Sequence, residues 1–216
     1  MRKPIGFGLA IVSLVIAFGS VACTRDEQTP RPSTTELTGG TIASTSGRSW
    51  HDVTRNWPDA SRSAVKEMVE KYGPPEELTS SQASWGSHGP WKRSVVSREV
   101  VLHDWPTPHE DVLEQVIDYR VPADRFDDLA QFDGSVMAER TKGELSARCG
   151  GESANYLALN LSRDIIEGTK TVEGARHVYE ASMKASKEGN KPEIMKSLSF
   201  APMPATEAAD RDRSIK

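Results

Sequence analysis

Two histidines and several carboxylates lie close together in the segment HDWPTPHEDVLEQVIDY at residues 103–119. Imidazole nitrogen and carboxylate oxygen are both common zinc ligands. We expect His103 at the end of a strand and His109 a few residues later, in the first turn of a helix. A tight connection between them would bring the two imidazoles together, with Asp104 as a third ligand or as an orienting partner. His103, Asp104 and His109 are therefore the candidate metal ligands, and zinc is the possible cofactor.

The same segment also has an interpretation without chemistry. Thr107-Pro108-His109-Glu110 has the pattern of a capping box with proline at the first helical position. Asp111 would add negative charge to that first turn, where the helix dipole favours it. The apolar residues that follow would form the buried face of a helix over 107–119: Val112, Leu113, Val116 and Ile117. The spacing of the histidines matches no strong metal motif such as H-E-x-x-H.

Cys149 precedes Gly150-Gly151 and a predicted helix. A thiolate at a helix N-terminus can have a lowered pKa, and glycine amides can bind an oxyanion, so this position would suit a nucleophile. No histidine lies within 25 residues of Cys149 in the sequence. Because cysteine is most often a small buried residue, we favour that role for Cys149.

Two further groups of residues are predicted to be structural. The aspartate-rich segment DRFDDLAQFDG (124–134) does not fit a calcium loop, and we expect a short amphipathic helix with water-facing carboxylates, ending in a turn at Asp133-Gly134. An exposed tryptophan patch could bind a sugar or a protein partner. Large aromatic side chains are mostly buried, so we favour packing roles for all five tryptophans: Trp50, Trp57, Trp85, Trp91 and Trp105.

Hydrophobic periodicity predicts the elements that must position these residues. Apolar residues from Val65 to Tyr72 recur at helical spacing, and Gly73 with Pro74-Pro75 ends that helix. Strand character follows at 81–85, 91–97, 98–103, 135–140 and 144–148. Two long helices are predicted over 152–168 and 171–189, the second capped by Thr171. Strands followed by helices predict an α+β fold, in which about four or five helices pack on a small antiparallel sheet.

The first residues have the layout of a secretory signal. Arg2 and Lys3 precede an apolar run from Ile5 to Phe18, which is too short to favour a spanning helix. The following residues 19–23, GSVAC, resemble the lipobox of bacterial lipoproteins, although Ser20 stands where leucine is usual. The resemblance implies that residues 1–22 are a signal peptide and that Cys23 carries acyl chains such as palmitate. The alternative is an ordinary secretory signal with an incidental cysteine.

Composition then divides the rest of the chain. Residues 23–49 are rich in Ser, Thr, Gly and Pro, so we expect a lipid anchor followed by a flexible tether. Residues 50–203 are predicted to form a single α+β domain, with 193–203 docked on it as a final arm. Residues 204–216 are predicted to be a disordered tail. In a cell with two membranes, Thr24 after the cysteine favours the outer membrane, facing the periplasm.

The net charge argues against nucleic acid as a partner, and the cysteine count argues against an intramolecular disulfide. The formal net charge is −4, and it becomes −6 once Arg2 and Lys3 are removed with the signal peptide. A mildly acidic protein lacks the basic surface that nucleic-acid binding requires. There are two cysteines, so lipidation of Cys23 leaves Cys149 without an intramolecular disulfide partner.

Five motifs in residues 60–185 together resemble a set of bacterial proteins of unassigned function: KYGPP, GPWKR, HDWPTPHEDVLEQVIDYRVP, FDGSV and GELSAR. That resemblance implies a domain reused as a unit and no catalytic residue. A fainter similarity is to outer-membrane assembly lipoproteins of the SmpA/OmlA type, from which the helices after residue 150 depart.

The leading hypothesis is a lipid-anchored cell-envelope protein that binds or scaffolds an envelope protein or glycan without catalysis. The alternative is a metal-binding protein or metal-dependent enzyme that uses His103, Asp104 and His109.

Overall fold

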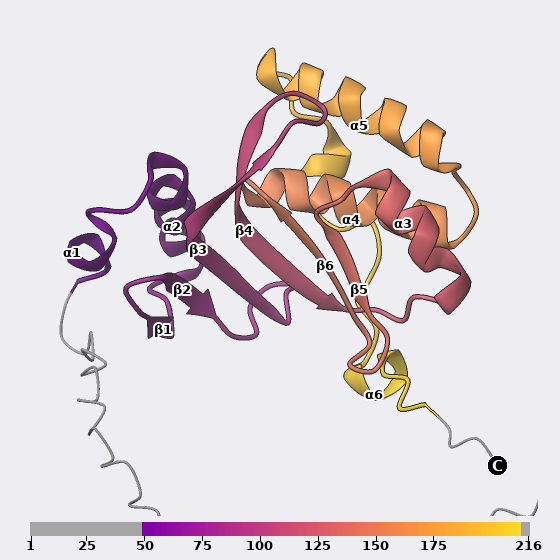
Figure 1. The fold of residues 1–216 in the computed structure, drawn as a ribbon, viewed down its shortest axis with the longest axis horizontal. Helices are drawn as coiled ribbons and strands as arrows, with labels where there is room; N and C mark the ends of the chain where they lie inside the picture. The colour runs from indigo at the N-terminus through magenta and orange to yellow at the C-terminus, as the bar shows by residue number, and fades with distance from the viewer. Residues whose placement is uncertain (1–48, 213–216) are drawn as a thin grey trace, which may run out of the picture. The chain divides into compact units, whose positions relative to one another are not determined.

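The computed structural model describes residues 49–212 (Figure 1). The predicted signal peptide, lipid anchor and tether lie outside the described residues, and so do residues 213–216 of the predicted tail. Within the described part, none of the helices combines the length and the apolar character that crossing a membrane requires.

A six-stranded sheet forms the centre of the domain, with its strands in the order β1-β2-β3-β4-β6-β5. Every pair of neighbours is antiparallel. The strands are β1 (Glu77–Leu78), β2 (Gln82–Trp85), β3 (Arg93–His103), β4 (His109–Asp118), β5 (Val136–Glu139) and β6 (Glu144–Cys149). The strands predicted at 81–85, 135–140 and 144–148 are confirmed. Those predicted at 91–97 and 98–103 are one strand, β3, whose pairing with β4 shifts between Val96 and Val101.

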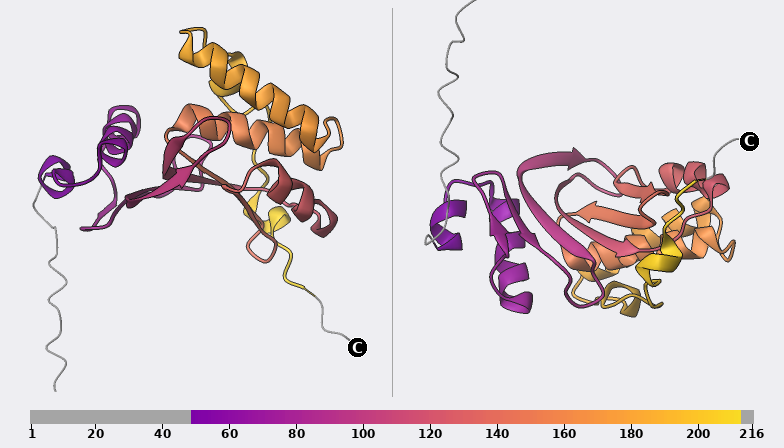
Figure 2. Two further views of the ribbon diagram at one scale, coloured as in Figure 1. Left: turned by 45° about the horizontal axis from the view of Figure 1, so that its top comes forward. Right: turned by 90° about the horizontal axis from the view of Figure 1, so that it is seen from below.

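Helices cover one face of this sheet, as the two views in Figure 2 show. The helices of the described part are α1 (Trp50–Thr54), α2 (Asp59–Tyr72), α3 (Phe126–Phe132), α4 (Glu152–Ile166), α5 (Val172–Lys187) and α6 (Ala205–Ala208). The Gln115 side chain of β4 contacts both Met68 of α2 and Glu152 of α4, so these two helices share that face. Helix α5 packs on α4 and α3. The predicted α+β fold is confirmed.

Local sequence signals set the helix ends. Gly73 ends α2 with a φ of +86°, a conformation that side chains disfavour, and its N–H donates to the Val69 carbonyl. Thr171 caps α5, as predicted, because its hydroxyl accepts a 3.1 Å hydrogen bond from the Gly174 N–H. The predicted aspartate-rich helix forms as α3, with Leu129 on its buried face.

Two apolar clusters lie between the helices and the sheet. One joins α2 to β2, β3 and β4, and the other joins β4, β5 and β6 to α3, α4 and α5. Trp57, Trp85 and Trp91 are buried in these clusters, so the packing role predicted for them is confirmed. Trp50 and Trp105 are half-buried and pack against the clusters.

The predicted helix over 107–119 is wrong, because this segment is the central strand β4. Val112 and Leu113 are both fully buried, and so are Val116 and Ile117. Neighbouring residues of any strand point to opposite faces of the sheet. Because both faces of β4 are buried, apolar residues occupy both, and the alternation of apolar and polar residues that marks a strand disappears from the sequence. The resulting spacing of apolar residues resembles that of one helix face. The segment forms a strand because it pairs with β3 on one side and with β6 on the other.

The chain after α5 packs closely on the domain. Met195 is buried and both Leu198 and Phe200 pack against the core, so the predicted docking of residues 193–203 is confirmed. The predicted disorder is wrong for residues 204–212, which include α6 with Ala208 fully buried. Gly143 permits this docking, because a Cβ atom there would lie 2.2 Å from the carbonyl carbon of Ala208.

Candidate metal centre

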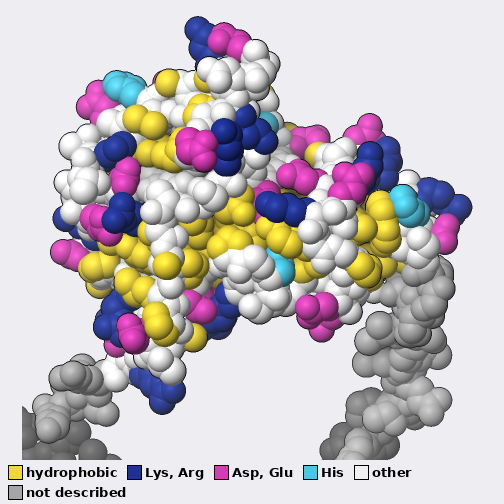
Figure 3. Space-filling view, turned by 180° about the vertical axis from the view of Figure 1, so that it is seen from behind, with side chains coloured by type: hydrophobic (Ala, Val, Ile, Leu, Met, Phe, Trp, Pro, Cys, Tyr) yellow, Lys and Arg dark blue, Asp and Glu magenta, His cyan; other side chains and the backbone are white. Residues whose placement is uncertain are grey.

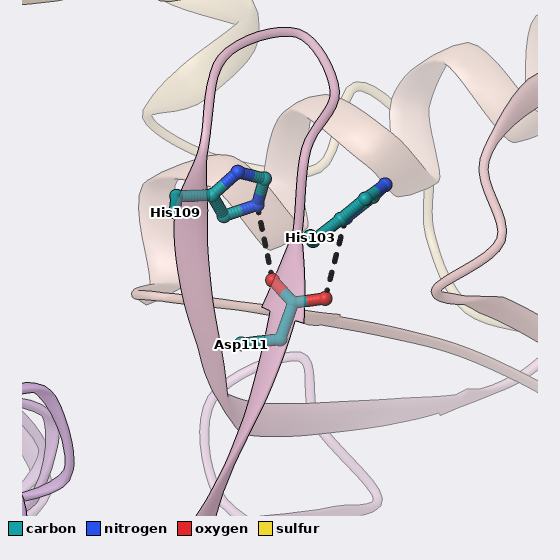
Figure 4. Close-up of side chains that lie close together, drawn as sticks. All are labelled: His103, His109 and Asp111. Carbon is teal, nitrogen blue, oxygen red and sulfur yellow. Dashed lines mark ion pairs between the residues drawn. The ribbon is translucent and has the colours of Figure 1, made fainter.

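The β3–β4 hairpin brings both candidate histidines together. His103 ends β3 and His109 begins β4, and the two residues are paired directly across the ladder. Asp111 follows two positions after His109, so both side chains leave the same face of β4. Figure 4 shows the Asp111 carboxylate between the two imidazoles. Asp104, the third predicted ligand, lies exposed in the hairpin loop and outside this group.

The three side chains are in direct contact. His103 Nδ1 lies 3.3 Å from Asp111 Oδ2, and His109 Nε2 lies 3.0 Å from Asp111 Oδ1. One ligand atom from each residue can be chosen so that all three lie within 4.8 Å of one another. Asp111 is completely buried, whereas each histidine side chain is 20 % exposed. The carboxylate therefore forms the floor of the site and the imidazoles its rim.

Further polar groups hold these ligands in place. The Ser135 hydroxyl donates a short hydrogen bond to Asp111 Oδ2. Asp133 is also buried, accepts a 2.8 Å hydrogen bond from the Ser135 N–H, and has Oδ1 4.0 Å from His103 Nε2. The expectation of a water-facing carboxylate is thus wrong for Asp133, because the connection from α3 to β5 turns it inward.

His109 is oriented by the backbone. Its Nδ1 lies 2.9 Å from the Thr107 carbonyl oxygen, and a carbonyl can only accept, so Nδ1 carries the proton. In the neutral ring, Nε2 is then an unprotonated nitrogen that faces the Asp111 carboxylate. A histidine that donates its other ring N–H to a carbonyl is the usual arrangement of a metal-ligating imidazole.

The electrostatics of the group follow from burial and close contact. The Asp111 carboxylate, then Cys149 nearby, raise the pKa of His109 to about 11. Burial by itself would raise the pKa of Asp111, but His109, Ser135 and the charge of His103 lower it below its ordinary value. Burial raises the pKa of Asp133. The group thus favours a positively charged His109 beside an ionised Asp111.

Two buried atoms of the group lack a well-aligned hydrogen bond. Within residues 49–212, His109 Nε2 and Asp111 Oδ1 find no partner with hydrogen-bond geometry, although they lie 3.0 Å from each other. A buried nitrogen lone pair and a carboxylate oxygen repel unless a cation separates them. Either a proton on Nε2 or a metal ion fulfils that requirement.

The hairpin loop packs over the site and onto α5. The Trp105 ring lies against Tyr179 and Phe132, with ring centroids 4.7 and 6.1 Å away. Its indole N–H donates to Glu180, and the Arg176 guanidinium lies 3.9 Å over the same ring. These contacts fix the loop that joins the two histidines.

Cys149 lies beside this group at the end of β6. It is buried, as predicted, and its sulfur lies 4.0 Å from the Tyr179 hydroxyl. It also lies near enough to His109, a residue far away in the sequence, to raise the pKa of that imidazole. Its exposed fraction of 5 % leaves little access for a substrate, so a role as nucleophile is not favoured.

The sequence indicates both histidines but not three of their neighbours in the site. Its patterns place Asp111 at a helix start and Asp133 in a turn, and they indicate no role for Ser135. The H-x-D spacing of His109 and Asp111 would have indicated Asp111 had the segment been interpreted as a strand. No pattern in the sequence indicates Asp133 or Ser135, because they come from the connection between α3 and β5, far from the histidines along the chain.

The face of the domain in Figure 3 carries acidic and basic side chains interspersed, with apolar side chains between them, and thus no stripe of one sign. Comparison of the chain with protein-family models, curated proteins and solved structures found no match.

Proposed function

We propose that this domain binds a divalent transition-metal ion, zinc by ligand type, through His103, His109 and Asp111. The observation that supports the proposal is the contact between His109 Nε2 and Asp111 Oδ1, which are 3.0 Å apart, buried and not aligned for a hydrogen bond. A metal ion accepts lone pairs from both atoms at once.

The distances agree with this proposal. Zinc binds imidazole nitrogen and carboxylate oxygen at about 2.0–2.2 Å, so neighbouring ligand atoms in a tetrahedral site lie about 3.3 Å apart. The contacts of Asp111 with His103 and His109 measure 3.3 and 3.0 Å. Because the two histidines face different oxygens of Asp111, an ion bound by all three residues requires their side chains to rotate toward one point.

Metal analysis of the full chain in detergent, after dialysis against zinc, tests this proposal. We expect one equivalent of zinc in the wild type and its loss in His109→Ala and in Asp111→Asn, because each removes a ligand. Asp104→Ala is the matched control, since Asp104 lies in the same hairpin but outside the group. Circular dichroism of each variant separates loss of ligand from loss of fold. A folded wild type without zinc, or equal loss in Asp104→Ala, would refute the site.

We also propose that the domain works at a bacterial envelope membrane, attached through lipidated Cys23. The support is the lipobox-like GSVAC at residues 19–23. In this proposal the domain is a non-catalytic binding module, whose envelope partner is a protein or glycan. Fractionation of cells that express Cys23→Ser tests the anchor, and we expect the variant to leave the membrane fraction. Retention of Cys23→Ser in that fraction would contradict lipid anchoring.

A further inference from the structure

We propose that Cys149 is a fourth metal ligand, so that the site is a closed zinc centre of two nitrogens, one oxygen and one sulfur. This inference rests on the proposed metal binding and specifies its ligand set. It assigns the ion a structural task, which is to join β3, β4 and β6.

Strand register places Cys149 next to the other ligands. Cys149 is paired with Leu113 across the β4–β6 ladder. Asp111 precedes Leu113 by two residues, so it shares the face of β4 that Cys149 occupies on β6. The two residues are therefore diagonal neighbours, roughly 7–8 Å apart between backbone positions, a span that two ligand side chains and an ion can bridge.

Contacts of the thiol point in the same direction. Gly150, the residue after Cys149, lies against β4 beside the ligands, because a Cβ atom there would be 3.1 Å from the Glu110 carbonyl oxygen. Cys149 is also near enough to His109 to raise the pKa of that imidazole. Its sulfur is otherwise placed near the Tyr179 hydroxyl, at 4.0 Å, which is a weak interaction. The sulfur lies outside the group of three ligand atoms that are within 4.8 Å, so binding requires rotation of the Cys149 side chain toward His109.

Charge balance favours a thiolate in this position. Asp111 is fully buried and Cys149 is 5 % exposed, so the ion would lie in a region where unbalanced charge is costly. One carboxylate and one thiolate neutralise the two positive charges of zinc. When the ion binds, the S–H bond breaks, a Zn–S bond forms, and the proton leaves to bulk water.

A fourth protein ligand also determines what the site can do. Structural zinc sites are tetrahedral with four protein ligands, whereas catalytic sites keep a position open for water. With Cys149 bound, the tetrahedron is complete and no position remains for a substrate. The same ligand would connect β6 to the hairpin tip. There, between His109 and Leu113, β4 is paired with β3 but not with β6.

Cobalt(II) titration of the full-length chain that carries Cys23→Ser tests this inference. In that chain Cys149 is the single cysteine, so any sulfur-to-cobalt charge-transfer band in the near ultraviolet must come from it. We expect such a band together with the visible bands of tetrahedral cobalt. Adding Cys149→Ser should abolish the charge-transfer band and weaken zinc binding by about 100-fold or more, since even indirect partners of a ligand contribute 10–100-fold.

The outcomes separate the two proposals. Visible cobalt bands without a charge-transfer band would overturn the role of Cys149 and leave the three-ligand site intact. Absence of any cobalt or zinc binding by the folded chain would overturn both. The rate of labelling by a thiol reagent provides a second measurement. Because Cys149 is buried, the reagent reaches it only when the domain opens locally, and zinc bound to the sulfur should slow that reaction. Equal labelling rates for the zinc-loaded and the chelator-treated chain would also contradict the inference.

Discussion

Asp111 differs from the two histidines because it is the one ligand candidate that is completely buried. Burying a carboxylate costs several kcal/mol unless charges and hydrogen bonds compensate it. Here His103, His109 and Ser135 all surround its two oxygens. The site therefore depends on Asp111 for more than one ligand atom, since without it the two imidazoles would lose their common partner.

A second buried carboxylate, Glu144, shows the same principle with arginine as the partner. Arg93 Nη1 and Nη2 each lie 2.7 Å from one oxygen of Glu144, and Lys92 Nζ lies 3.0 Å from Oε1. The hydrogen bonds from Arg93, and then those from Lys92, lower the pKa of Glu144 from 4.5 to about 2. This ion pair links β3 to β6 across the central strand β4.

The depressed pKa of Glu144 predicts an acid-dependent stability. Because the carboxylate binds its proton less readily in the folded state, its contribution is fully present above pH 4.5 and is lost as the pH falls toward about 2. We expect Glu144→Gln to reduce the free energy of unfolding by about 2 kcal/mol at pH 7 and to flatten its decline between those pH values. Urea denaturation across this pH range measures both effects.

Glu139→Gln is the control for that comparison. Glu139 is the partner of Glu144 in the β5–β6 ladder, but its side chain is 50 % exposed and pairs with Lys142. Exposed ion pairs contribute little, so this variant should change stability by less than about 1 kcal/mol. Equal pH profiles for Glu144→Gln and the wild type would show that the ion pair does not govern acid stability.

At the scale of elements, sequence patterns predict those with one buried face. Helices α2 and α5 alternate apolar and polar sides, and Gly73 and Thr171 mark an end of each, so their positions could be predicted within a few residues. Strand β4 could not, because burial of both faces removes the alternation that identifies a strand. The error arises from the central place of β4 in the sheet, which only the pairing of distant segments determines.

That error also limited what could be predicted about the site. A strand places His109 and Asp111 on one face, whereas a helix start would place Asp111 at the first turn as a capping charge. The proximity of His103 and His109 could still be predicted, because the connection between them is short whether a helix or a strand follows it. The contributions of Asp133, Ser135 and Cys149 depend on β5 and β6, so their positions follow from topology alone.

Across the whole molecule, the two apolar clusters meet at a buried carboxylate, Glu152 at the start of α4. One of its oxygens accepts from the Tyr72 hydroxyl at 2.6 Å and from the Trp91 indole N–H at 2.7 Å. Lys71 of α2 pairs with the other oxygen. Glu152 is thus well satisfied and connects α2 to α4, which fits a structural role better than a catalytic one.

The tip of the β3–β4 hairpin is held by Trp105, which packs against Tyr179 of α5, and by the proposed metal centre. Metal binding at the tip should therefore stabilise the whole domain, because the site forms only when the strands are paired. At free zinc 100 times the dissociation constant, the gain is about 2.7 kcal/mol, which corresponds to roughly 5–10 °C in the melting temperature of a domain of this size.

Thermal unfolding of the full chain with zinc and with a chelator measures this gain. We expect Asp104→Ala to show the same difference as the wild type, because Asp104 is not a ligand in the proposed site. His109→Ala should show almost no difference in melting temperature between zinc and chelator, since the variant lacks a ligand and binds little zinc for the chelator to remove. A wild type that melts at one temperature under both conditions, although saturated with zinc, would mean that the ion binds the unfolded chain as well as the folded one. It would then not join the strands.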